Sequence, residues 1–271
     1  MKYSLKQFVN KVFGRIEHLL TAPRLRVLKT IYVNYRSLPF TQAIHLPIYV
    51  YGKVKIHSLK GTMEIKGPIK KGMIKIGMPT FGPVIDYFGS FLLNDGKIIF
   101  EGEVIICNNC TISVYNGATL VLKNKAYFAE KVRVVCSNYI EIGEGTRIIH
   151  ESQLMDTNFH YIIDLTKDIA TYPKGEIVIG KWSWISNRTT IQKGTILPDY
   201  TIVGSNSLLN KNYSDIPPFS LLGGMPAKLI KTGLRRVFNI ESEKMLNNWF
   251  LENGEDAKYK YIGKDIDAFC Q

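Results

Sequence analysis

An aliphatic residue recurs at every sixth position between Ile179 and Leu209. The series consists of Ile179, Ile185, Ile191, Leu197, Val203 and Leu209. Four positions after each of the first five stands a small hydroxyl residue, at Ser183, Thr189, Thr195, Thr201 and Ser207. A period of six fits neither an α-helix nor an alternating strand, and it is the period of a parallel β-helix. We therefore predict an all-β solenoid whose aliphatic residues stack inside and whose small residues lie at the corners.

The same register continues backwards through Leu154, Ile148 and Ile142. Between Leu154 and Ile179 it jumps by 25 residues, one more than four hexads. We therefore expect a loop at about 158–176 to leave one coil of the solenoid.

Before Ile142 the pattern weakens, because Glu130 and Asn124 stand where aliphatic residues would be needed. Stretches such as 97–106 still alternate as strands do. We expect irregular coils in this region, forming the atypical N-terminal cap that a solenoid needs.

The segments that flank the repeat differ from it in character. Residues 3–20 have the spacing of an amphipathic helix, which Pro23 would end or kink. This helix belongs to a basic N-terminal module with short strands, which we assign to residues 1–75. We assign the β-helix to residues 76–232 and a C-terminal helical extension to residues 233–271.

The C-terminal extension is expected to contain a helix from Phe238 to Phe250. Asn239 is its expected N-cap, since an Asn side chain can accept a bond from the unpaired N–H groups of a first turn. The expected buried side chains are Phe238, Met245, Leu246, Trp249 and Phe250.

Charge is distributed unevenly along the chain, whose formal net charge is +12. Residues 1–75 contain fifteen Lys or Arg and only two acids, Glu17 and Glu64. Such a module can contact an anionic surface, so residues 1–30 could lie on a membrane. The alternative is that the helix caps the open end of the solenoid. The basic residues are dispersed and form no recognition motif, so we predict no nucleic-acid partner.

Composition limits the compartment as well. The 271 residues include 45% hydrophobic residues, but no apolar run is long enough for a transmembrane helix. The N-terminus lacks the pattern of a signal peptide. Four cysteines without such a signal fit a reducing cytoplasm. We predict a cytoplasmic protein that touches the inner face of the cell membrane if its N-terminal helix binds lipid.

The expected loop carries the strongest candidate for catalysis. Its opening residues include His160, with Asp156 and Asp164 within four positions on either side. A neutral imidazole is a suitable general base for a hydroxyl nucleophile near pH 7. Either carboxylate could accept the other ring N–H and fix the tautomer, as a carboxylate does in a hydrolase triad. A loop histidine without a catalytic task is the simpler alternative.

We predict no metal site. His150 lies inside a hexad, and no third histidine accompanies it and His160 in the repeat. Cys107 and Cys110 form a single CxxC pair, which is more typical of buried thiols than of zinc binding when no second pair exists.

These motifs resemble the hexapeptide-repeat acyltransferases, whose fold is a left-handed parallel β-helix. The resemblance extends from Ile142 to Lys231. Its strongest segments are Ile179-Gly180-Lys181-Trp182-Ser183-Trp184-Ile185-Ser186, Val203-Gly204-Ser205-Asn206-Ser207, Ile216-Pro217-Pro218-Phe219-Ser220 and Gly223-Gly224-Met225-Pro226-Ala227-Lys228.

The resemblance implies a homotrimer that binds acetyl-coenzyme A along the groove between neighbouring β-helices. It implies that His160 takes a proton from an acceptor hydroxyl, which attacks the thioester directly. It also assigns coenzyme-binding positions to Trp184, Asn187, Ser205, Lys211, Lys228 and Lys231. Lysines suit the coenzyme's phosphates, since they place mobile positive charges at a groove mouth.

We therefore predict an acetyl-coenzyme A-dependent O-acetyltransferase that modifies a hydroxyl of a sugar or polysaccharide precursor. Alternatives are N-acetylation of an amino sugar, acetylation of serine, or a β-helix scaffold without catalysis. A nucleotidyltransferase fusion is excluded, because no βαβ unit with a glycine-rich loop precedes the repeats.

Overall fold

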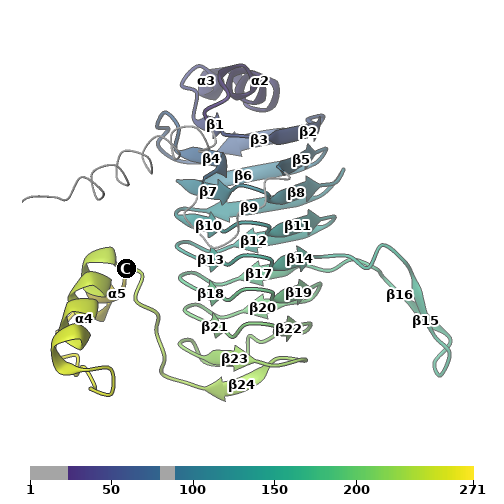
Figure 1. The fold of residues 1–271 in the computed structure, drawn as a ribbon. Helices are drawn as coiled ribbons and strands as arrows, with labels where there is room; N and C mark the ends of the chain where they lie inside the picture. The colour runs from purple at the N-terminus through teal and green to yellow at the C-terminus, as the bar shows by residue number, and fades with distance from the viewer. Residues whose placement is uncertain (1–23, 80–88) are drawn as a thin grey trace, which may run out of the picture.

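The computed structural model describes residues 24–79 and 89–271. In these residues three sheets of parallel strands run side by side as the faces of one prism (Figure 1). Successive strands pass from face 1 to face 2 to face 3 and then return to face 1 one coil further on. The prediction of a left-handed parallel β-helix with an N-terminal helical cap and a C-terminal helix is confirmed.

The faces differ in their number of strands. Face 1 contains β1 (Ile48–Val50), β4 (Ile74–Met78), β7 (Val104–Cys107), β10 (Ala126–Phe128), β13 (Arg147–Ile148), β18 (Trp184–Ile185), β21 (Ile202–Val203), β23 (Leu221–Gly223) and β24 (Lys228–Lys231). Face 2 contains β2 (Val54–Ser58), β5 (Ser90–Asn94), β8 (Thr111–Val114), β11 (Arg133–Cys136), β14 (Gln153–Met155), β19 (Thr190–Gln192) and β22 (Leu208–Leu209). Face 3 contains β3 (Thr62–Ile65), β6 (Lys97–Glu101), β9 (Thr119–Lys123), β12 (Tyr139–Ile142), β17 (Ile177–Ile179) and β20 (Ile196–Leu197).

The hexad aliphatics fill the prism, as the sequence predicts. Ile185, Ile191 and Val203 are each fully buried. The small residues at the corners are buried too, and most of their hydroxyls bond to the backbone, although Thr195 Oγ1 has no partner among the described residues. Ser152 shows the pattern, since its Oγ donates to Ser186 O at 3.0 Å and accepts from Thr189 N at 3.2 Å. A corner hydroxyl therefore satisfies backbone groups that the turn leaves unpaired.

The coils before Ile142 are more regular than the sequence suggests. Phe128 is fully buried, and it pairs with Ile106 of the preceding coil and with Ile148 of the next. Strands in this half run to five residues, whereas most of those after β17 have two. The segment 97–142 therefore continues the same three faces.

Longer turns explain why the hexad is hidden there. Ile112 pairs with Val134, and Leu122 pairs with Ile142, so these residues occupy equivalent inward positions in successive coils. The step from Ile112 to Leu122 is ten residues and that from Val134 to Ile142 is eight. Extra residues at the corner between faces 2 and 3 thus shift the register without disturbing the stack.

Strands β1 to β3 already form a coil of this prism. They lie within residues 1–75, which the sequence analysis assigned to a separate basic module. The expected amphipathic helix at 3–20 lies outside the described residues.

Two other helices, α2 (Val27–Ser37) and α3 (Phe40–Ala43), lie over the N-terminal end of the prism (Figure 1). Asn34 bonds to both backbone groups of Ile48, accepting from its N–H at 3.1 Å and donating to its carbonyl at 2.7 Å. Thr30 Oγ1 accepts from Val50 N at 3.0 Å. Side chains of helix α2 thereby satisfy backbone groups at the open edge of β1, which could otherwise pair with another strand.

The C-terminal extension contains α4 (Ile240–Asn253) and α5 (Ile266–Cys270), which lie beside the prism (Figure 1). Asn239 is the N-cap of α4, accepting from the backbone N–H groups of Glu241 and Ser242. The expected buried face is wrong in part. Phe238 is buried, but no residue within α4 is, and Met245 is 37% exposed. Within the described ranges, no helix is both long and apolar enough to cross a membrane.

Candidate functional site

A hairpin leaves the prism between β14 and β17, in the range 158–176 where the sequence predicts a loop. Its strands are β15 (Ile162–Asp164) and β16 (Ile169–Thr171), which pair antiparallel and project from the corner between faces 2 and 3 (Figure 1). At its base Thr157 pairs with Lys174, and Asn158 N donates to Pro173 O at 2.9 Å. The hairpin is therefore held at its base by backbone contacts.

His160 lies just beyond this base and its side chain is exposed. The residue before it, Phe159, has a φ of 60°, and its N–H donates to Thr157 Oγ1 at 2.9 Å. The Phe159 ring packs edge-on against Tyr115, two coils earlier, with ring centroids 5.9 Å apart. His160 thus follows a side chain that is fixed on the prism. Among the described residues its imidazole has no hydrogen-bond partner.

Asp156 is fully buried and binds the neighbouring coil. Its carboxylate accepts from Ser137 N at 2.7 Å and from Asn138 N at 2.8 Å. Burial raises the pKa of this carboxyl, although the backbone donors of Ser137 and Asn138 act in the opposite direction. In the single chain Asp156 therefore fixes the turn between β11 and β12 and has no bond to His160.

Asp164 lies in β15 and serves the hairpin itself. Its carboxylate accepts from Thr166 N at 2.9 Å and from Thr166 Oγ1 at 2.5 Å. These bonds lower the pKa of Asp164, with the Thr166 hydroxyl as the largest cause. Lys167 Nζ lies 3.8 Å away. The structure therefore brings neither predicted carboxylate to His160.

Two predicted coenzyme positions do come together, at the corner between faces 1 and 2. Asn187 and Ser205 follow the paired strands β18 and β21 by the same two residues. Ser205 Oγ donates to Asn187 Oδ1 at 2.6 Å, and Asn206 N donates to Asn187 O at 3.1 Å. His150 occupies the same position one coil earlier, since its carbonyl accepts from Arg188 N at 3.1 Å. The result is a polar column along one edge of the prism.

The predicted phosphate-binding lysines all lie at the C-terminal end of the prism. Lys228 and Lys231 begin and end β24, which pairs antiparallel with β23, and both side chains are exposed. Lys211 Nζ lies 5.3 Å from the centre of the Tyr213 ring. Ala227 N donates to Leu208 O at 2.8 Å, which places Lys228 next to the coil that carries Ser205.

Trp184 lies on face 1, where the C-terminal extension reaches it. The Arg236 guanidinium carbon is 4.4 Å from the centre of its ring. The buried indole Nε1 has no hydrogen-bond partner among the described residues. Sequence reasoning missed the Arg236 contact, because no local pattern brings a residue 52 positions later onto the same surface.

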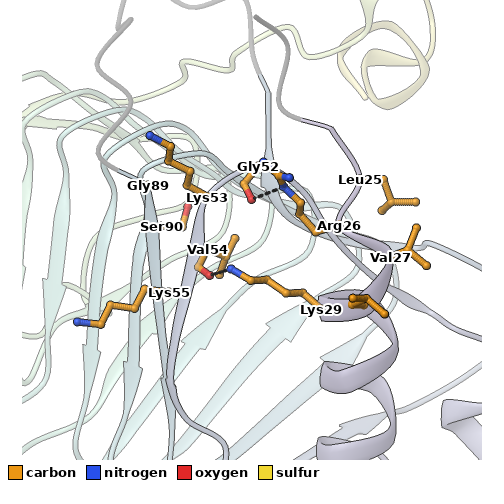
Figure 2. A pocket seen from close by; sticks show the side chains of 11 residues that line it. Leu25, Arg26, Val27, Lys29, Gly52, Lys53, Val54, Lys55, Gly89 and Ser90 are labelled. Carbon is orange, nitrogen blue, oxygen red and sulfur yellow. Dashed lines mark hydrogen bonds between the residues drawn. The ribbon is translucent and has the colours of Figure 1, made fainter. Parts of the chain in front are cut away.

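A cavity of about 760 Å³ lies where α2 meets the first coil (Figure 2). Arg26 Nε donates to Gly52 O at 3.2 Å, and Lys29 Nζ donates to Val54 O at 2.5 Å. These two cationic side chains hold helix α2 against the first coil. The cavity lies at the N-terminal end of the prism, away from the hairpin.

The four cysteines are buried and reduced. Burial raises the pKa of Cys107 to about 12, so its thiol stays protonated near neutral pH. In the described part of the chain, no group of three His, Cys, Asp or Glu side chains is placed to hold a metal ion.

Two known acetyltransferases are similar in sequence to this chain. The Escherichia coli (strain K12) protein WbbJ, a candidate lipopolysaccharide biosynthesis O-acetyl transferase, is 24% identical over 152 residues, covering 53% of this chain and 76% of WbbJ. A chloramphenicol acetyltransferase of Agrobacterium fabrum is 26% identical over 110 residues, covering 36% of this chain and 51% of that enzyme. No protein-family model matches the chain.

Among solved structures, the polySia-specific acetyltransferase NeuO aligns with a TM-score of 0.43 and 17% identity, covering 78% of this chain and 85% of NeuO. Because this TM-score is low, the fold assignment depends on the strands of the chain itself, and the acetyltransferase assignment depends on the sequence relatives. The resemblance to hexapeptide-repeat acyltransferases and the prediction of an acetyltransferase are confirmed.

Proposed function

We propose that this protein transfers an acetyl group from acetyl-coenzyme A to a hydroxyl of a saccharide, with His160 as the general base. The observation that carries the proposal is the position of His160. It is an exposed imidazole directly after an anchored residue, at the one corner where the described coils eject a hairpin of defined structure.

The reaction needs one base and no covalent enzyme intermediate. The neutral imidazole takes the proton of the acceptor hydroxyl as its oxygen attacks the thioester carbonyl. The bond from carbon to sulfur then breaks, and the imidazolium returns the proton to the departing coenzyme A thiolate. An ester and a free thiol are the products, so thiol release measures turnover.

The site also needs more than one chain. His160 stands at the corner between faces 2 and 3, whereas Asn187 and Ser205 stand at the corner between faces 1 and 2. Two different edges of one prism cannot both contact the same ligand. This supports the homotrimer, in which His160 of one protomer meets Asn187, Ser205, Lys211, Lys228 and Lys231 of its neighbour. Asp156 or Asp164 would orient His160 only after a rearrangement of the hairpin.

Loss of the imidazole tests the catalytic role. His160→Ala should lower kcat by about 10²–10⁴-fold, the usual contribution of a general base. The melting temperature should stay the same, because the side chain is exposed. Thiol release is followed with acetyl-coenzyme A and a panel of sugars. His45→Ala, an exposed histidine of the N-terminal cap, is the matched control. Full turnover by His160→Ala would refute the assignment, and an amine acceptor in place of a hydroxyl would indicate N-acetylation.

The shared site can be tested by complementation. His160→Ala and Ser205→Trp are co-expressed with different tags, and mixed oligomers are purified. If a site draws on two protomers, the mixed oligomers recover activity that neither variant has alone. No recovery would place both residues in one protomer. Light scattering checks for a mass of three 30.8 kDa chains.

A membrane contact through residues 1–30 is a separate proposal. Of these residues the structure describes 24–30, where Val27 and Leu28 are 59% and 83% exposed beside Arg26 and Lys29. Apolar and basic side chains together suit an anionic lipid surface. Removing residues 1–20 should abolish sedimentation with anionic vesicles. If the shortened protein instead aggregates, the segment is a cap.

A further inference from the structure

A second concave surface lies on face 1, over strands β4, β7, β10 and β13. Its volume is about 360 Å³. We call it the face-1 groove. It is lined by Lys70, Lys71, Gly72, Met73, Lys75, Glu103, Ile105, Lys125, Ala126, Tyr127 and Arg147.

The charge of this groove is strongly one-sided. Five of the side chains that line it are cationic, and Glu103 is the only carboxylate. Glu103 is already paired with Lys70, at 3.2 Å. Among the described residues Lys71, Lys75 and Lys125 form no salt bridge, and neither does Arg147. Neighbouring charges of one sign in a concave surface concentrate the potential and attract anions.

The strands give the groove its length. Lys75, Ile105, Tyr127, Arg147 and Trp184 occupy paired positions on β4, β7, β10, β13 and β18, so their side chains form one outward column. Parallel strands lie about 4.8 Å apart, so Lys75 and Arg147 are separated by about 14 Å. An extended chain of several sugar units fits this length better than a single small anion does.

At the C-terminal end of the groove, Arg147 lies against aromatic rings. The Arg147 guanidinium carbon lies 5.8 Å from the Tyr127 ring centre and 5.1 Å from that of Phe238. Beside it, the buried Nη1 of Arg236 and Nε1 of Trp184 have no hydrogen-bond partner among the described residues. Burial and the nearby Arg147 lower the pKa of Arg236, whereas Glu243 acts in the opposite direction. Both guanidiniums thus lie over the Phe238 ring, and among the described residues neither forms a salt bridge.

We propose that the face-1 groove binds an anionic saccharide, and that the acceptor of this enzyme carries carboxylate or phosphate groups. The cations along the column pair with these groups, and Arg147 can contact one of them in a bidentate manner. The ring of Tyr127, which lines the groove, flanks the sugar units. The role as acceptor depends on the proposed saccharide acetyltransferase, whereas the binding itself does not.

Calorimetry with the full chain, in the absence of acetyl-coenzyme A, tests the binding. The probes are oligogalacturonate, which carries carboxylates on the chain, maltohexaose phosphate, which carries a phosphate on the chain, and neutral maltohexaose. One of the two anionic probes should bind, and which one does identifies the source of the charge. Maltohexaose should not bind. Equal binding of maltohexaose, or of a short single-stranded DNA, would overturn the proposal.

Charge reversal locates the site. Lys71→Glu with Lys75→Glu should weaken the anionic probe by about tenfold or more. Lys258→Glu with Lys260→Glu makes the same change in net charge on the exposed C-terminal extension and should leave the affinity unchanged. Equal effects of the two pairs would refute a specific groove. Melting curves show whether each variant is folded, and Arg147→Gln provides a milder second change.

Thiol release separates this inference from the proposed function. If anionic and neutral sugars are acetylated equally well, and Lys71→Glu with Lys75→Glu has no effect, the groove is not the acceptor site although the enzyme is an acetyltransferase. If the groove binds the anionic probe but no saccharide is acetylated, the proposed function fails and the binding site stands.

Discussion

The prism and its ejected hairpin differ in how far their apolar side chains are buried. In the coils from β17 to β22, each inward aliphatic is buried, and the corner hydroxyls of Ser183, Thr189, Thr201 and Ser207 bond to the backbone. In the hairpin, Ile162, Ile163 and Leu165 are 58%, 60% and 83% exposed. The prism can therefore supply stability alone, while the hairpin is free to carry chemistry. Exposed apolar side chains on a projecting hairpin also suit contact with a neighbouring chain.

The largest expected effect on stability comes from the prism wall. Ile191→Ala should lower the free energy of unfolding by about 2–5 kcal/mol, since it leaves a cavity in a fully buried stack. Ile163→Ala makes the same chemical change in the hairpin and should alter it by no more than about 0.5 kcal/mol. Chemical denaturation of both variants measures the difference. Equal losses would show that the hairpin folds as part of the prism.

A smaller effect is expected where the hairpin joins the wall. Asp156→Asn retains one acceptor oxygen, but two backbone N–H groups, of Ser137 and Asn138, now depend on Asp156. One buried donor would lose its partner, which costs about 1–3 kcal/mol. Denaturation measures this loss, and thiol release measures turnover. A large fall in kcat at unchanged stability would instead favour Asp156 as the partner of His160.

The smallest change in stability is expected at Phe159. Phe159→Ala removes the edge contact with Tyr115, and such aromatic pairs contribute about 0.5–1.5 kcal/mol. Because His160 follows directly, we expect kcat to fall while KM for acetyl-coenzyme A stays the same. Phe159→Tyr keeps the ring and should keep the activity. An unchanged kcat for Phe159→Ala would show that His160 does not depend on this anchor.

The regular coils and the hairpin also differ in how much of their structure could be predicted from the sequence. From Ile179 to Leu209 each coil consists of hexads, so the inward positions follow from counting. At the corner between faces 2 and 3 earlier coils carry extra residues, as between Ile112 and Leu122, and counting fails. The position of His160 on an ejected segment was predictable from the register jump. The partners of Asp156 were not, because Ser137 and Asn138 lie one coil earlier.

The sequence by itself determined the period and, with it, the fold, the buried aliphatics of the regular coils, the corner hydroxyls and the place where one coil is interrupted. These are local properties, because every hexad makes the same turn. Only the tertiary structure decided which distant residues share an edge or a face. It placed Asn187 beside Ser205, separated both from His160, and aligned Lys75, Tyr127 and Arg147 in one charged groove. The physical reason is that residues of different coils become neighbours by stacking. Which residues stack depends on the number of residues in each coil, and that number varies with the length of each corner.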